Sequence, residues 1–289
     1  MIKPILNKLF WGGFRHLLTD KQYGRFRYWL ELDRWPDFKN PQSFSEKIQY
    51  IKLHQRTELR QRVADRNRVR TYVVEKIGEE HLIPLIGNYD EFTNKVWESL
   101  PNQFVLKANH GCGMVEIVQD KSSRNGDKIQ KLTRQWQQFD YYNFGREWVY
   151  KNILRTIIVE ELLKTLEGDI PEDYKFFCFG GKVNVIQIDF DRFGDHTRNL
   201  YDRNFNLLPA KLLYPNNTQP VKKHSLLNQA IEVAETLSAD FDFIRVDLFL
   251  VDQQVYFGEL TNYPGNGFAE FDPISFDKEL GEKWNLKKN

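Results

Sequence analysis

The pattern of apolar residues changes near Phe104, and this change limits the folds open to the chain. Before it, helix caps and breaks separate longer segments that predict helices. After it, short apolar runs between tight turns predict strands, as in residues 174–179 and 182–188, which Gly180-Gly181 would join as a hairpin. Helices combined with largely antiparallel strands predict α+β layers and not a parallel sheet wound from βαβ units.

The predicted helices have recognisable ends. Ser43 and Glu46 form a capping box after the break at Asn40-Pro41, so a helix is predicted to reach about His54. The next helix is predicted from Glu58 to Ile77, ending near Gly78. Further helices are predicted at 127–138 and 225–237, and further strands at 82–86, 104–108, 115–118, 156–159, 243–251 and 254–260.

Composition excludes several classes of protein. The 289 residues suffice for one to three domains. The chain has 41 basic and 40 acidic residues, a formal net charge of +1, so no overall basic field would draw it to nucleic acid. The only cysteines, Cys112 and Cys178, argue against a disulfide scaffold and a structural zinc site, and favour a reducing, cytoplasmic setting.

The N-terminal residues 1–30 mix apolar and basic side chains. Lys3, Lys8 and Arg15 interrupt the apolar run, which matches neither a signal peptide nor a spanning helix. As a basic amphipathic helix the segment could lie on the inner face of a membrane, and an ordinary packing helix is the alternative. We therefore expect a cytoplasmic protein for which peripheral membrane contact stays open.

A lysine and a glycine loop follow each other after Phe104. Lys107 ends an apolar strand, and Gly111 and Gly113 lie in the loop of residues 109–114. Glycines let the backbone approach a ligand and direct N–H groups at phosphate oxygens, and a lysine adds a positive charge. The motif fits neither the Walker pattern nor the dinucleotide fingerprint, so a plain hairpin turn remains the alternative.

Two acids fall on the strands of the last predicted hairpin. Asp247, in an Arg245-x-Asp247 motif, and Glu259 can lie opposite each other if the turn is near Asp252-Gln253. Facing carboxylates in an apolar sheet need a cation, and Mg²⁺ is commonly held by one or two carboxylates together with substrate phosphates. The alternative is that each acid faces solvent.

Two further groups are rich in charge. Glu160-Glu161 follows an apolar strand and could be an ordinary strand end. The second group could recognise an anion, because Arg pairs bidentately with carboxylate or phosphate, or it could be a solvated loop. It consists of Asp189, Asp191, Arg192, His196 and Arg198.

These elements occur in the order typical of ATP-grasp proteins: lysine strand, glycine loop, acidic hinge, then Arg-x-Asp and Glu with Pro-Gly. From about Leu18 to Phe271 the chain resembles one branch, the teichuronopeptide-biosynthesis (TupA-like) ATP-grasp proteins. The segments that carry the resemblance are residues 40–47, 83–87, 104–113, 173–179, 191–199 and 245–265.

The resemblance implies an ATP-grasp fold of two α+β lobes whose antiparallel sheets hold ATP between them. A mainly helical region at residues 1–100 would precede a small lobe with the glycine loop at 101–170. A C-terminal lobe with the metal site would follow at 171–289. ATP and Mg²⁺ are the implied cofactors.

The resemblance also implies a role for each matching residue. Lys107 would hold the ATP phosphates under the loop of residues 109–114, and Arg245 would stabilise an acyl-phosphate and its tetrahedral successor, so these two are the catalytic candidates. Glu160 would lie beside the adenine amino group, and Asp169 competes with Glu167 for the ribose. The implied ATP-binding set is Arg66, Lys107, Asn109, His110, Gly111, Cys112, Gly113, Glu160, Glu161, Leu163, Glu167 and Lys175; the implied metal ligands are Asp247, Glu259 and Thr261.

Two positions depart from the superfamily pattern. Asp65 is followed by Arg66 where a lysine is usual, which keeps the charge but not the compact ammonium. Thr261 stands two residues after Glu259 where Asn is usual, with Asn262 next to it, and this puts a second metal ion in doubt.

The implied reaction is ATP-dependent joining of a carboxylate and an amine through an acyl-phosphate. The substrates would be a small-molecule or saccharide carboxylate, preferably a uronic acid, and an amino acid or other amine, in bacterial capsule or other surface polysaccharide synthesis. One alternative is a metal-dependent glycosyltransferase that uses Asp189-Phe190-Asp191. Another is a non-catalytic nucleotide-binding protein, which Arg66 and Thr261 favour.

Overall fold

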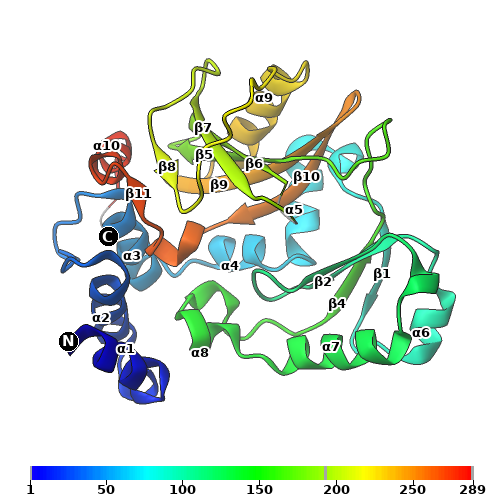
Figure 1. Cartoon of the computed structure of the whole chain (residues 1–289), viewed down its shortest axis with the longest axis horizontal. Helices are drawn as coiled ribbons and strands as arrows, with labels where there is room; N and C mark the ends of the chain where they lie inside the picture. Colours follow the sequence, from blue (N-terminus) through cyan, green and yellow to red (C-terminus); the bar gives the residue numbers. More distant parts are fainter. Residues whose placement is uncertain (1, 192–193, 288–289) are drawn as a thin grey trace.

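The computed structural model describes residues 2–191 and 194–287. Its strands form two main sheets and one small one, and every strand pair is antiparallel, which confirms the predicted α+β class (Figure 1). The first sheet has the order β1 (Leu85–Tyr89), β4 (Ile157–Glu160), β2 (Phe104–Ala108), β3 (Val115–Val118). The second has the order β10 (Gln254–Thr261), β9 (Phe243–Val251), β5 (Asp173–Phe179), β6 (Lys182–Phe190), β7 (Thr197–Asp202), and β11 (Phe271–Asp272) pairs with β8 (Lys211–Leu212).

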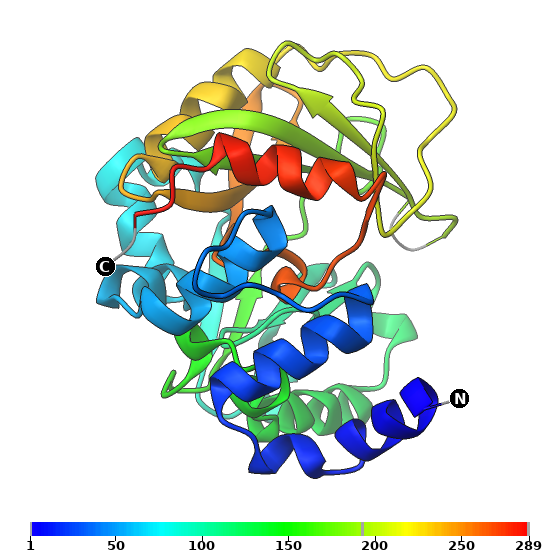
Figure 2. The same cartoon turned by 90° about the vertical axis from the view of Figure 1, so that its left-hand side faces the viewer.

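Alternation of side chains along the strands lets helices cover both faces of the five-stranded sheet. Phe176 and Cys178 of β5 pack in one core with α9 (Leu227–Ser238) and α5 (Arg68–Ile77). Phe177 and Phe179 point to the opposite face, where α3 (Phe44–His54) and α10 (Ser275–Lys283) lie side by side (Figure 2). This burial on two sides makes the sheet a rigid platform for side chains near its ends.

The four-stranded sheet is smaller and has its own core. Helices α6 (Asn94–Ser99) and α7 (Gly126–Gln138) lie along it, and Ile129 of α7 packs with apolar residues of β2 and β4 (Figure 1). The other helical segments are α1 (Ile2–Trp11), α2 (Asp20–Leu32), α4 (Glu58–Ala64), α8 (Tyr141–Gly145), η1 (Phe14–Leu17), η2 (Glu79–His81), η3 (Lys121–Ser123), η4 (Trp148–Tyr150) and η5 (Pro264–Gly267). Within the described residues, none of the helices is both long and apolar enough to cross a membrane.

Three predicted elements are wrong in detail. The helix predicted over 58–77 is two helices, because the Asp65 carboxylate accepts the N–H of Asn67 at 2.9 Å and stabilises a turn in place of a helical bond. The strand predicted at 82–86 begins only at Leu85, after Pro84, which has no N–H to donate to a neighbouring strand. The charged segment after Asp191, interpreted as a loop, includes strand β7 from Thr197.

Candidate functional site

A cleft lies between the two main sheets. Its walls include Lys107 of β2 and Val115 of β3 on one side, and Lys175 of β5 and Asp247 of β9 on the other. The space within it, counted out to open solvent, is about 3100 Å³. Side chains from both sheets therefore face one shared space.

The acid pair predicted on the last hairpin is present. Glu259 of β10 is the register partner of Asp247 on β9, after a bulge at Gly258. A Cβ at Gly258 would meet the Asp247 carbonyl oxygen at 3.0 Å, so glycine allows this close approach. Arg245 donates two hydrogen bonds of 2.6 Å to Asp247 and one of 3.2 Å to Glu259. The alternative of separate solvent-facing acids is wrong, since one guanidinium contacts both.

The two acids differ in their electrostatic surroundings. Burial raises the pKa of Asp247 to about 6, although Arg245 and Lys175 oppose this. Burial also disfavours the charged form of Glu259, but Arg66 and Arg245 outweigh it and lower the pKa to about 2. Glu259 is therefore ionised at neutral pH, and Asp247 ionises as the pH rises past about 6. Above that pH the site presents two carboxylates.

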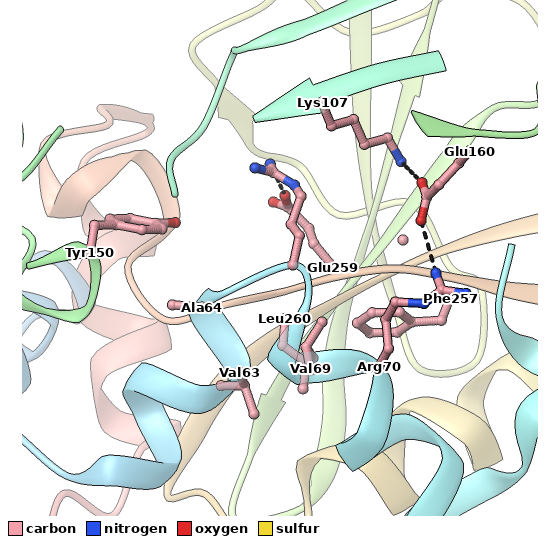
Figure 3. A pocket seen from close by; sticks show the side chains of 12 residues that line it. Val63, Ala64, Val69, Arg70, Lys107, Tyr150, Glu160, Phe257, Glu259 and Leu260 are labelled. Carbon is pink, nitrogen blue, oxygen red and sulfur yellow. Dashed lines mark hydrogen bonds and ion pairs between the residues drawn. The ribbon is translucent and has the colours of Figure 1, made fainter. Parts of the chain in front are cut away.

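Glu160 lies between two cations in a recess beside the cleft. Lys107 Nζ lies 2.6 Å from Glu160 Oε2, and Arg70 Nη1 lies 3.0 Å from Oε1 (Figure 3). Lys107 and Glu160 come from β2 and β4, which are adjacent strands, and Arg70 comes from α5. The arrangement holds the ammonium of Lys107 at the wall that the recess and the main cleft share.

Arg66 joins the glycine loop to the acid pair. Its Nη1 donates to the carbonyl oxygens of Ala108, at 2.7 Å, and Gly111. Its Nη2 donates to Glu259 Oε2 at 3.1 Å. Arg66 lies in the break between α4 and α5, where the helix prediction is wrong.

The predicted anion-recognition group lines the part of the cleft around Asp189 and Arg198, which we call the far end. Asp189 is 2% exposed and accepts hydrogen bonds from Arg198 Nε and from Gln187 at 3.1 Å; Lys175 Nζ lies 3.0 Å from its Oδ2. Burial raises the pKa of Asp189, but the charges of Lys175 and Arg198 outweigh it and hold that pKa below its ordinary value. His196 Nε2 lies 3.4 Å from the same carboxylate. The alternative of a solvated loop is wrong for Asp189 and Arg198, which are buried.

Comparison with known proteins identifies the family. The model of the TupA-like ATP-grasp family matches residues 46–285. The chain belongs to this family. No curated protein matches it significantly.

The chain is also similar to solved ATP-grasp structures, with low identity and TM-scores. D-alanine–D-alanine ligase from Bacillus anthracis complexed with ATP has 13% identity and a TM-score of 0.44, with 77% of this chain and 65% of that chain covered. The Helicobacter pylori enzyme of the same name has 16% identity and a TM-score of 0.39, with 78% of this chain and 61% of that chain covered. N5-carboxyaminoimidazole ribonucleotide synthetase from Thermus thermophilus has 11% identity and a TM-score of 0.38, with 75% of this chain and 47% of that chain covered. The chain thus spans less than two thirds of the length of each.

Most residues that the family resemblance singles out line the one cleft. Glu160 lines the adjoining recess, and Arg192 is outside the described residues. The residues that line the cleft are Arg66, Lys107, Cys112, Gly113, Glu161, Leu163, Lys175, Asp189, Asp191, His196, Arg198, Arg245, Asp247 and Glu259. Asn109, His110, Gly111, Glu167 and Thr261 do not line it.

Two of these five residues, Asn109 and His110, lie behind the cleft wall. The Asn109 amide is buried and bonds to Asp65 at 3.0 Å and to the Thr156 N–H at 2.8 Å. His110 is buried with Nε2 3.3 Å from the Phe139 carbonyl oxygen. The Thr261 hydroxyl donates to Glu259 at 2.7 Å. Asn109 and His110 therefore support the loop from behind, and Thr261 contacts the acid pair directly.

The neighbouring Asn262 is directed away from the acids. Its side-chain oxygen accepts from Arg60 Nη1 at 3.1 Å, and its amide donates to the Arg60 carbonyl oxygen at 3.0 Å. Of the two candidates beside Glu259, Thr261 is therefore the one in contact with the acid pair.

Several residues of the cleft escaped the sequence analysis. Tyr214 lies at the far end, where its ring centroid is 3.7 Å from that of His196 and 4.7 Å from Arg198 Cζ. Phe249 of β9 and Gln187 of β6 also line the cleft. Tyr214 lies in an irregular segment without periodicity, and no pattern in the sequence distinguishes it. Arg70, which lines the adjoining recess, lies four residues after Arg66 within the segment predicted as one helix.

Proposed function

We propose that the protein is an ATP- and Mg²⁺-dependent carboxylate–amine ligase that acts through an acyl-phosphate. Membership of the ATP-grasp family supports this reaction class in general. The observation that carries the proposal is the convergence, in one cleft, of Lys107, Lys175 and Arg245 with the acids Asp247 and Glu259.

The nucleotide would occupy the side of the cleft near β2 and the segment after β4. Ile83, Val105 and Phe249 offer apolar surfaces for a base, and backbone groups at Glu161 and Leu163 could pair its edge. Lys107, which Glu160 orients, would meet the phosphates. Asp169 lines the cleft and Glu167 does not, which favours Asp169 as the ribose ligand.

The donor set of the acid pair suits Mg²⁺. Asp247 and Glu259 offer carboxylate oxygens, and Thr261 adds a hydroxyl next to Glu259. Among the described residues no three His, Cys, Asp or Glu side chains gather as a complete metal site, so phosphate oxygens would have to supply the remaining ligands. A bound Mg²⁺ would neutralise phosphate charge during transfer.

The reaction needs positioning and charge neutralisation. An oxygen of the acceptor carboxylate bonds to the γ-phosphorus of ATP while the bond to ADP breaks. The amine nitrogen then attacks the acyl carbon and loses a proton, and phosphate leaves. Lys107 and Lys175 would neutralise charge on the transferred phosphoryl group, and Arg245 would stabilise the acyl-phosphate and the tetrahedral intermediate.

The acceptor would bind at the far end, near Asp189 and Tyr214. Arg198 and Lys175 suit a carboxylate, while the Tyr214 ring and the polar Gln187 suit a sugar. A uronic acid joined to an amino acid or other amine, in bacterial surface polysaccharide synthesis, is therefore our preferred substrate pair. Catalysis would take place in the cytoplasm.

Phosphate release tests the proposal. We expect purified protein with ATP and Mg²⁺ to release phosphate only when both a uronic acid and an amine are present, and mass spectrometry should find the amide. ATP binding without release for any acid–amine pair would favour the non-catalytic alternative. Tight binding of UDP-sugars without ATP binding would favour a glycosyltransferase, although the contacts of Asp189 with Lys175 and Arg198 already disfavour an Asp-x-Asp metal site there.

A variant at the far end separates acceptor from nucleotide binding. We expect Arg198→Lys to raise the KM for the acid substrate by about tenfold, because lysine keeps the charge but loses the planar fork. The KM for ATP should stay unchanged, and steady-state kinetics with each substrate varied in turn measures both. An equal rise in both values would contradict the assignment of Arg198 to the acceptor.

A further inference from the structure

The N-terminal helices present apolar side chains to solvent. Ile5 and Leu9 are one turn apart on α1, so they share a face, and they are 62% and 57% exposed. Phe14 and Leu17 of η1, a segment in contact with α1, are 46% and 82% exposed. Phe10, on the other side of α1, is fully buried. A surface helix is normally polar on its solvent side, so the exposed face of α1 requires an explanation.

The uncompensated charge of this region is positive. Residues 2–19 contain no acid. Lys8, Lys21 and Arg25 are exposed and form no ion pair with any described residue. The acids of residues 20–35 are all paired: Asp20 with Arg56 at 2.5 Å, Glu31 with Arg27 at 3.4 Å, and Asp33 with Lys3 at 2.9 Å.

Helix α2 also contacts a residue next to a segment that lines the cleft. Phe268 packs with Tyr28 and Leu32 of α2, and Arg27 Cζ lies 4.5 Å from its ring centroid. Phe268 directly follows η5 (Pro264–Gly267), which lines the cleft. The helices α1 and α2 lie outside the matched residues 46–285, at one end of the molecule (Figure 2).

We propose that α1, η1 and α2 form a docking surface for an anionic lipid bilayer. Exposed apolar side chains would enter the interface while lysine and arginine contact the headgroups, the composition that holds amphipathic helices on such membranes. The contact through Phe268 would keep the cleft near the bilayer, within reach of a lipid-linked acceptor. Only this last step rests on the proposed function, since docking itself needs no catalysis.

Vesicle sedimentation tests the docking surface. The full chain should sediment with phosphatidylglycerol vesicles and not with phosphatidylcholine vesicles, and raising the salt from about 0.1 M to about 0.5 M should weaken the binding. The double variant Leu9→Glu, Leu17→Glu should bind about tenfold or more weakly, because it removes two apolar anchors and adds negative charge.

A matched control uses two leucines elsewhere that are more than half exposed, like Leu9 and Leu17. Leu154 and Leu207 are 76% and 56% exposed, so the double variant Leu154→Glu, Leu207→Glu should keep wild-type vesicle binding. Both double variants should retain the thermal unfolding midpoint and ATP binding. The proposal is overturned if the wild type binds both lipids equally or binds neither, or if the Leu9→Glu, Leu17→Glu variant still binds phosphatidylglycerol vesicles. It is also overturned if the wild type forms a concentration-dependent dimer in sedimentation and this variant abolishes the dimer, because the exposed face would then bind a second copy of the chain. Phosphate release with soluble substrates, measured in parallel, reports on the proposed ligase independently.

Discussion

Replacing Glu259 by glutamine is expected to lower the rate of ATP turnover by about a thousandfold, the loss typical when a group that stabilises transition-state charge is removed. The substitution keeps the size of the side chain but removes the charge that Arg66 and Arg245 hold ionised. It would therefore leave Asp247 as the single carboxylate of the pair. Phosphate release at saturating ATP and Mg²⁺ measures the effect on kcat.

The control for this variant lies on the same hairpin. Asp252 is at the β9–β10 turn with a φ of 53°, which asparagine tolerates, so Asp252→Asn makes the same acid-to-amide change away from the cleft. It should retain wild-type turnover. If Glu259→Gln keeps more than about a tenth of the wild-type kcat, the assignment of Glu259 to the metal site is wrong.

The acid pair was predictable because hairpin register follows from the turn. Counting back from Asp252-Gln253 places Asp247 near Glu259, and the ladder pairs these two residues. The bulge at Gly258 was not foreseen, although it shifts the register by one residue and allows the pairing. Local turn chemistry thus predicted the partners but not the backbone irregularity between them.

Arg66 and Tyr214 show where sequence reasoning fails. The periodicity of residues 58–77 predicts one helix, but Asp65 accepts both the N–H of Asn67 and the side-chain amide of the distant Asn109. Arg66, in the resulting break, reaches the carbonyl oxygen of Ala108 beside the glycine loop. Tyr214 reaches the cleft because the segment after β8 returns toward β7, where Arg198 N–H donates to the Pro215 carbonyl oxygen. Both placements depend on contacts between residues distant in sequence, which local patterns do not report.

Arg245→Met is expected to lower the unfolding free energy by about 3–5 kcal/mol in the absence of divalent ions, the usual cost of removing one partner from a buried ion pair. Arg245 donates hydrogen bonds to both Asp247 and Glu259, so its loss leaves the two carboxylates facing each other. Arg66 would still contact Glu259. For a chain of this size the unfolding midpoint should fall by roughly 10 °C in a thermal scan.

Mg²⁺ should recover part of this stability, because an ion that binds the folded state at the acid pair shifts the unfolding equilibrium by mass action. The recovery should be larger in Arg245→Met than in the wild type, in which the guanidinium already neutralises the acids. The matched variant is Arg60→Met, which also removes one partner of a buried ion pair. Arg60 pairs with Asp242 at 2.6 Å and donates to Asn262, the residue directed away from the acid pair. It should be destabilised without recovery by Mg²⁺. Equal recovery in both variants would mean that the ion binds elsewhere, and then Asp247 and Glu259 are an ion-pair network of the fold and not a metal site.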